Sequence, residues 1–188
     1  MKRINLKKII ISSLVIIYFF LVGNKFNIFE KKTTLSPLPK TKYQAKCTRV
    51  IDGDTIEVIF VGSNKLSEKK EKIRFIGVNT PEMNFNKKEE PEYWAKEATS
   101  FTKKELENRY IELQFDNISE NKDKYGRYLC YVWNDNYLFN QILIESGNGF
   151  YYPNFEFNNK MMDTFQKAEI YAAKNKMGLW ENVSGKKD

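Results

Sequence analysis

The sequence predicts an α+β fold in which five short β-strands form a small barrel that carries about three helices. Short runs rich in β-branched and aromatic residues, separated by turn residues, indicate the strands. Helical spacing of apolar residues begins only after the third of these runs. The 188 residues, 41% of them hydrophobic and 15% aromatic, suffice for one packed domain with a terminal appendage.

The five predicted strands cover residues 47–51, 55–61, 72–78, 110–115 and 128–133. The turn sequence of residues 52–54 separates the first two strands, and a polar stretch over residues 63–71 leads to the third. Ile111, Leu113 and Phe115 alternate with more polar residues in the fourth, which is typical of a strand with one buried face.

Three helices are predicted between and after these strands. Pro91 suits the first turn of a helix that runs to Leu106. A short helix over residues 137–146 is stopped by Gly147, and a last helix covers residues 160–176. A five-stranded barrel with helices of this size is typically an OB fold (oligonucleotide/oligosaccharide-binding fold).

Residues 1–30 are predicted to be a signal peptide or a signal anchor. A basic start with Lys2, Arg3, Lys7 and Lys8 precedes an apolar run over residues 9–22. That run is shorter than the ~20 residues of a typical spanning helix. A clean cleavage site is lacking, so the sequence leaves open whether the protein is secreted or stays anchored to the cell membrane by residues 7–23. Both alternatives place the domain outside the cytoplasm.

The rest of the chain divides into a proline-containing linker (31–42), the folded domain (43–183) and a polar tail (184–188). The net charge of +7 falls to +3 without residues 1–30, because that segment carries five Lys or Arg residues and one Glu. This mild basic excess is a weak argument for a polyanionic partner, so an argument for function must come from a site.

The absence of histidine from the chain excludes several kinds of active site. A Ser-His-Asp or Cys-His nucleophile, an imidazole base and a His-ligated zinc centre are all impossible. Two cysteines also rule out a four-thiolate metal site. Cys47 and Cys130 could form a disulfide in an exported protein, or be two small buried side chains, and the sequence leaves both open.

Four clusters carry residues suited to chemistry without histidine: 52–55, Arg74 with 79–82, 123–127 and 149–152. Each alone has an ordinary interpretation as a turn, a helix start or a packing segment. Together they supply carboxylates and two arginines, which suit phosphodiester hydrolysis. Forked arginines stabilise charge that develops on phosphorus, oxygen ligands hold a hard cation, and a carboxylate deprotonates the attacking water.

These motifs resemble those of the staphylococcal nuclease (thermonuclease) family of calcium-dependent nucleases. The segment Asp52-Gly53-Asp54-Thr55-Ile56-x-Val58 resembles the first signature of the family, and Arg74-Phe75-Ile76-Gly77-Val78-Asn79-Thr80-Pro81-Glu82 its continuation. Asp123-Lys124-Tyr125-Gly126-Arg127-x-Leu129 resembles the second signature. Order and spacing agree over about residues 47–180.

The resemblance implies a calcium site and a catalytic set. Asp54 is implied as the principal Ca²⁺ ligand, supported by Asp52, and the Asn79 side chain and the Thr80 carbonyl complete the protein's ligands. Glu82 would act on the attacking water.

The resemblance also implies how substrate is held. Arg74 and Arg127 would contact the scissile phosphate, and Lys124 and Tyr125 a terminal phosphate of a bound nucleotide. Either Tyr151 or Tyr152 would line the base and sugar pocket, and the sequence does not decide between them.

Two departures from the family pattern stand out. Asn79 occupies a position where the family usually has Asp, and the loss of one negative charge predicts weaker calcium binding rather than its loss. The stretch between Thr55 and Arg74 is longer than usual and contains a Lys/Glu-rich insertion at 65–72, which we interpret as a longer hairpin loop.

The expected function is therefore an extracytoplasmic, calcium-dependent nuclease that hydrolyses phosphodiester bonds of DNA and RNA with little sequence specificity. We expect it to act as a monomer, with membrane contact possible through the N-terminal segment. One alternative is a catalytically weak or inactive OB-fold module that binds nucleic acid. Another is a membrane-tethered structural domain without a ligand.

Overall fold

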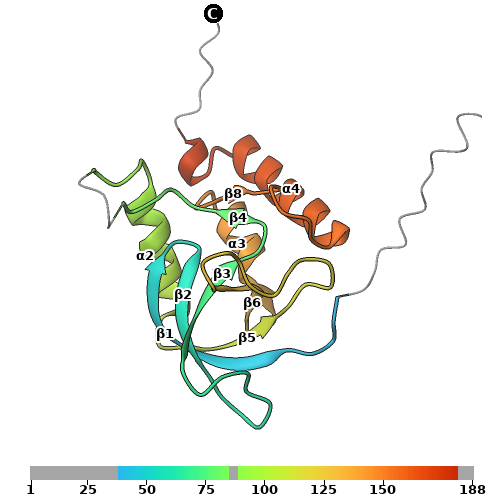
Figure 1. The fold of residues 1–188 in the computed structure, drawn as a ribbon. Helices are drawn as coiled ribbons and strands as arrows, with labels where there is room; N and C mark the ends of the chain where they lie inside the picture. The colour runs from blue at the N-terminus through green and yellow to red at the C-terminus, as the bar shows by residue number, and fades with distance from the viewer. Residues whose placement is uncertain (1–37, 85–88, 182–188) are drawn as a thin grey trace, which may run out of the picture. The chain divides into compact units, whose positions relative to one another are not determined.

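The computed structural model describes residues 38–84 and 89–181 (Figure 1). The predicted signal segment (1–30), most of the linker and the polar tail (184–188) lie outside these residues, so those predictions stay predictions. Among the helices of the described residues, none is long and apolar enough to cross a membrane.

A mixed barrel of five strands forms the body of the domain. The strands are β1 (Tyr43–Asp52), β2 (Thr55–Phe60), β3 (Lys70–Phe75), β5 (Tyr110–Gln114) and β6 (Tyr128–Asn134). They follow the order β3-β2-β1-β5-β6 with antiparallel neighbours, and a parallel pairing of β3 with β6 closes the sheet. The predicted five-stranded barrel of OB type is thus confirmed.

Alternation along each strand explains the core of the barrel. Val58 on β2, Ile73 on β3 and Leu113 on β5 are completely buried, while their neighbours along each strand are more exposed. Two register shifts in β1, each of which places an extra residue opposite β2, bend this long strand around the barrel. Burial of these side chains is the main source of the domain's stability.

The third strand differs from its prediction at both ends. β3 starts at Lys70, inside the stretch expected to be a loop, and ends at Phe75. Gly77 then turns the chain with φ +71°, so that β4 (Val78–Asn79) leaves the barrel and pairs with β8 (Phe150–Tyr151) in a second, two-stranded sheet. This corner carries Asn79 and Thr80 away from the barrel wall.

The helices are α2 (Ala95–Leu106), α3 (Phe139–Glu145) and α4 (Asn159–Lys174), followed by a short 3₁₀ turn, η1 (Gly178–Trp180). α2 starts four residues after Pro91 because Trp94 has a left-handed backbone (φ +71°), which a helix cannot contain. α3 starts at Phe139 because residues Tyr137–Leu138 form strand β7 on β6. α4 lies beside α3 (Figure 1) and buries Phe165 against Tyr131.

Both cysteines are free and buried. Cys47 lies on β1 and Cys130 on β6, and β5 separates these strands. The two cysteines are therefore small buried side chains and do not form a disulfide. Burial raises the pKa of Cys47 to about 11.

The β3–β4 corner gives a test of the fold. A Cβ atom at Gly77 would lie 2.6 Å from the Phe165 ring and 2.7 Å from the Phe157 ring. Gly126 has a similar φ of +78°, but nothing lies within 4 Å of its Cβ position. We expect Gly77→Ala to lower the free energy of unfolding by about 2–4 kcal/mol, and Gly126→Ala by only about 1 kcal/mol. Urea denaturation checks this, and equal losses would contradict the packing argument.

Candidate active site

The carboxylate of Asp54 is the centre of the candidate site. It belongs to the turn between β1 and β2, and only 5% of the residue is exposed. One carboxylate oxygen, Oδ2, lies 3.0 Å from Nη2 of Arg74 and accepts a 2.9 Å hydrogen bond from the backbone N–H of Thr80. The other, Oδ1, accepts a 3.0 Å hydrogen bond from the Thr55 hydroxyl. A single side chain therefore joins β2, β3 and the segment after β4.

Arg74 fixes the β3–β4 corner with the rest of its guanidinium group. Its Nη1 donates to the carbonyl oxygens of Phe75 (2.9 Å) and Val78 (2.6 Å), and its Nη2 donates to Oδ1 of Asn79 (3.0 Å). The planar, forked geometry of arginine allows these contacts at once. We call Asp54, Arg74, Asn79 and Thr80 the hub.

The turn of residues 52–54 is pressed against the hub and against α2. A Cβ atom on Gly53 would come within 2.8 Å of the Thr80 hydroxyl, so only glycine permits this approach. From α2, the Thr102 hydroxyl donates to the Gly53 carbonyl (2.6 Å), and the Thr99 hydroxyl donates to Oδ1 of Asp52 (3.3 Å). The helix thereby sets the position of both aspartates.

Glu82 brings a third carboxyl group to this place. Burial raises its pKa above the ordinary value, and the charges of Asp52 and Asp54 and a side-chain hydrogen bond with Asp52 raise it further, against the opposite effect of Arg74. Burial, together with the Asp54 charge, raises the pKa of Asp52 as well. The structure therefore brings Asp52, Asp54 and Glu82 together beside one arginine. A cluster of this kind attracts cations.

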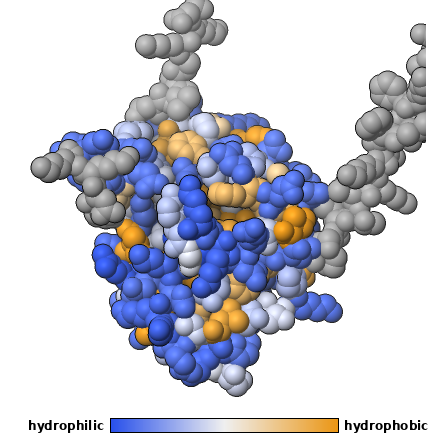
Figure 2. All heavy atoms as spheres, in the orientation of Figure 1, coloured by the Kyte–Doolittle hydropathy of each residue, from blue (hydrophilic) through white to orange (hydrophobic). Residues whose placement is uncertain are grey.

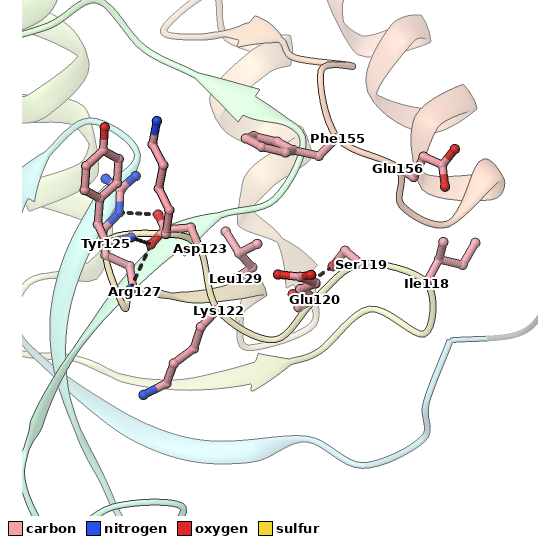
Figure 3. A pocket seen from close by; sticks show the side chains of 11 residues that line it. Ile118, Ser119, Glu120, Lys122, Asp123, Tyr125, Arg127, Leu129, Phe155 and Glu156 are labelled. Atoms are coloured by element: carbon pink, nitrogen blue, oxygen red, sulfur yellow. Dashed lines mark hydrogen bonds and ion pairs between the residues drawn. The ribbon is translucent and has the colours of Figure 1, made fainter.

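The second signature forms a tight turn before β6. Oδ1 of Asp123 accepts the backbone N–H groups of Tyr125 (2.9 Å) and Arg127 (3.0 Å), and Oδ2 accepts from Nε of Arg127 at 2.7 Å (Figure 3). Burial opposes ionisation of Asp123, but these bonds hold its pKa below the ordinary value. Nη1 of Arg127 lies 3.5 Å from the Thr55 hydroxyl, which connects this turn to the neighbour of Asp54.

A pocket of about 490 Å³ opens beside this turn. Tyr125 and Arg127 lie at one side of it, and Leu129 and Phe155 are among the apolar residues of the wall (Figure 3). Lys124 also lines the pocket. Tyr125 is 72% exposed, and the Lys124 ammonium lies 5.1 Å from the centroid of its ring. The structure thus gathers the predicted phosphate-binding residues at the rim of a partly apolar pocket.

Phe155 is the residue that sequence reasoning missed. It lies in the loop between β8 and α4 and is 50% exposed, and its ring projects over the pocket in Figure 3. The available signal was a run of aromatic residues, Tyr151, Tyr152, Phe155 and Phe157, within which Phe155 has polar residues on both sides. An exposed aromatic ring at the edge of a pocket is well suited to stack on a planar ligand.

The structure distinguishes the two tyrosines that the sequence left open. Tyr151 packs edge-on against Phe157 (6.5 Å between centroids) and faces α4 through its N–H bond to Glu169. Tyr152 packs against Phe155 (5.6 Å) and shares a small cavity with Arg74. Tyr152 therefore shares a cavity with a residue of the hub, whereas Tyr151 pairs with Val78 on β4 and packs toward α4.

The oxygens of the hub suit a hard cation. Asp54 offers a carboxylate and Asn79 an amide oxygen, and the Thr80 hydroxyl is buried without a hydrogen-bond partner in the described chain. Calcium takes carboxylate, amide and carbonyl oxygens together with water. The described residues contain no group of three or more His, Cys, Asp or Glu side chains arranged to hold a metal, so water or substrate would have to supply further ligands.

The ion pair of the hub can be tested by its effect on stability. We expect Arg74→Gln to lower the free energy of unfolding by about 3 kcal/mol in chelator, because it leaves the buried Asp54 carboxylate without a counter-charge. Adding Asp54→Asn should recover part of that loss, with a coupling of about 1–3 kcal/mol between the two sites. Urea denaturation of the wild type, the two single variants and the double variant measures this coupling. If the losses in free energy of unfolding of the two single variants simply add in the double variant, a direct ion pair is contradicted.

Comparison with known proteins agrees with this architecture. The family model described as "Staphylococcal nuclease homologue" matches residues 72–182. The chain is 35% identical to the thermonuclease of Staphylococcus hyicus over 97% of this chain and 100% of that protein. It is 35% identical to the thermonuclease of Staphylococcus intermedius (96% and 99%) and 32% identical to Endonuclease YncB of Bacillus subtilis (84% and 72%). The chain belongs to the staphylococcal nuclease family.

Proposed function

We propose that this protein is a calcium-dependent nuclease that hydrolyses phosphodiester bonds of DNA and RNA with little sequence preference. The observation that carries the proposal is the hub, in which Asp54 contacts Arg74 at 3.0 Å and Thr80 at 2.9 Å, with Glu82 beside it. The relatives named thermonuclease and endonuclease support nuclease activity.

Arg74 and Arg127 are suited to stabilise the charge that develops on the phosphoryl oxygens. Arg74 is held by hydrogen bonds on both of its terminal nitrogens, so little reorganisation is needed when substrate binds. Arg127 uses Nε for Asp123 and reaches toward Thr55 with Nη1, and in the described chain its Nη2 donates to no protein group. That nitrogen can serve a phosphate at the pocket rim.

Glu82 is the proposed general base. It takes one proton from a water molecule at a carboxylate oxygen, and the resulting hydroxide forms the new P–O bond as the ester oxygen leaves with its electron pair. The raised pKa of Glu82 makes its carboxylate a stronger base than an ordinary glutamate. The ester oxygen then takes a proton from solvent.

Asp54, the Asn79 amide oxygen and the Thr80 carbonyl would hold the calcium ion. When bound there, Ca²⁺ supplies Lewis-acid stabilisation of the phosphate and positions it for attack. With Asn79, these side chains carry one formal negative charge, while Asp52 and Glu82 lie close enough to add to the local field. This supports metal binding that is weaker than in relatives with Asp at that position.

The chemistry of the pocket lining supports the proposed lack of sequence preference. Lys124 and Tyr125 would contact a phosphate, and Phe155 and Tyr152 would contact a base and its sugar. Stacking on an aromatic ring tolerates any base, because each base has a π face. The basic and apolar pattern of residues 1–30 supports action outside the cytoplasm, secreted or membrane-anchored.

The catalytic set gives the main test. We expect Glu82→Gln and Arg127→Ala each to lower kcat on DNA by about 10²–10⁴-fold in Ca²⁺, because they remove the base and a stabilising donor. Far-ultraviolet circular dichroism should stay unchanged. Lys167→Gln on α4 is the control and should keep full activity. Wild-type protein that retards DNA in a gel but cleaves neither DNA nor RNA with any metal would instead support a binding module.

Asn79 gives a separate test of the metal site. Asn79→Asp restores a carboxylate beside Asp54, so we expect the calcium concentration for half-maximal activity to fall about three- to tenfold. Calcium titration by calorimetry should show the same change in affinity without substrate. An unchanged midpoint in both measurements would exclude Asn79 as a ligand.

A further inference from the structure

The outer face of strands β1–β3 carries a second group of cations next to the hub. Arg49 on β1 lies opposite Glu57 on β2, and Glu57 lies opposite Lys72 on β3. Directly paired residues of antiparallel strands point to the same face of a sheet. With Lys70, two residues before Lys72, these side chains form what we call the basic barrel face.

The basic barrel face is continuous with the active site. Along β3, Ile73 and Phe75 are buried in the barrel, whereas Lys70 and Lys72 are exposed and Arg74 is partly exposed. Residues two apart on a strand share a face, so the two lysines lie on the side of the sheet that carries Arg74. The surface over β1–β3 is mostly hydrophilic in Figure 2.

Strand β6, the neighbour of β3, also carries residues of the active site on this side of the sheet. Arg74 lies opposite Leu129 in the parallel pairing of β3 with β6, and Leu129 lines the large pocket together with Arg127. Arg127 directly precedes β6 and lines the same pocket. Lys72 and Arg127 are the residues immediately before Ile73 and Tyr128, where the pairing of β3 with β6 begins, so Lys72 lies at the end of that pairing from which Arg127 extends.

Only part of the positive charge on this face is balanced within the protein. Lys70 forms a 2.8 Å ion pair with Glu57, which also accepts a hydrogen bond from Thr48. Across residues 38–84 and 89–181, Arg49 and Lys72 form no ion pair within 4.0 Å. Three cations and one carboxylate leave a net charge of +2, next to a site that already attracts phosphate.

The spacing along β3 suits a chain of phosphates. Successive outward residues on a strand are about 6.7 Å apart, so Arg74, Lys72 and Lys70 extend about 13 Å from the hub. Phosphates of an extended nucleic-acid strand recur at a similar separation, and they attract Lys and Arg without regard to base sequence.

We propose that the basic barrel face binds the phosphates of a nucleic-acid strand one or two nucleotides away from the bond that is cleaved. This inference rests on the proposed function, and it assigns to the chain a preference for long polynucleotides over short ones. Lys70 and Lys72 belong to the insertion at 65–72. The insertion therefore lengthens the hairpin and also adds two cations to the surface that would bind the substrate.

The test compares two variants that remove two cations each. The double variant Arg49→Gln/Lys72→Gln removes the two unpaired cations of the basic barrel face. The control, Lys167→Gln/Lys174→Gln, removes the same charge from exposed positions on α4. For a single-stranded oligonucleotide of about 30 residues, we expect the first variant to raise KM about fivefold with kcat unchanged. For a substrate with a single phosphodiester bond, KM should stay unchanged. The α4 variant should match wild type on both.

A binding measurement keeps this test separate from catalysis. With fluorescent oligonucleotide, the slope of log Kd against log salt concentration should become shallower by about 1.4 for the first variant, because two phosphate contacts are lost at ~0.7 each for a single strand. An unchanged slope, or an equal change in the α4 variant, would overturn the inference. If the wild-type protein cleaves neither substrate, the proposed function fails. The salt dependence of binding still shows whether the basic barrel face contacts phosphates.

Discussion

The buried ion pair between Asp54 and Arg74 is the interaction on which the site depends. Burying two charges is costly, and the cost is offset only where every remaining donor and acceptor finds a partner. Here the carboxylate also accepts from Thr55 and Thr80, and the guanidinium also donates to two carbonyl oxygens. The hydrogen bonds that offset the cost of burying the two charges also fix the segment that carries Asn79 and Thr80. Stability and preorganisation therefore come from one set of contacts.

Closure of the barrel brings the two arginines of the proposed catalytic set together. Arg74 is the penultimate residue of β3 and Arg127 directly precedes β6, and the parallel pairing of these strands starts at Ile73 and Tyr128. Parallel pairs need a long connection, and this one contains α2, β5 and the turn at Asp123. The site is consequently complete only when strands whose paired residues lie 55 positions apart in the sequence, such as Ile73 and Tyr128, have come together.

Much of the fold could be predicted from the sequence, because alternation and helical spacing are local signals. The β3–β4 corner could not, since Phe75, Ile76 and Val78 form one apolar run in which Gly77 looks like an interruption rather than a turn. The residue types of the site were visible in the motifs. Their convergence depends on register and barrel closure, which no local pattern specifies. Phe155 was missed because it is one of four aromatic residues over 151–157, and a loop has no periodicity that shows which of them faces a pocket.

The two buried thiols have a consequence for how the protein can be observed. Each cysteine lies inside the barrel with a raised pKa, so the reactive thiolate is scarce while the sheet is closed. An alkylating reagent reaches Cys47 or Cys130 only when the strands separate. The rate of thiol modification therefore reports how often the barrel opens, and the measurement needs no added label. Because the strands need no covalent cross-link, the same chain can also open and close in reducing and oxidising surroundings alike.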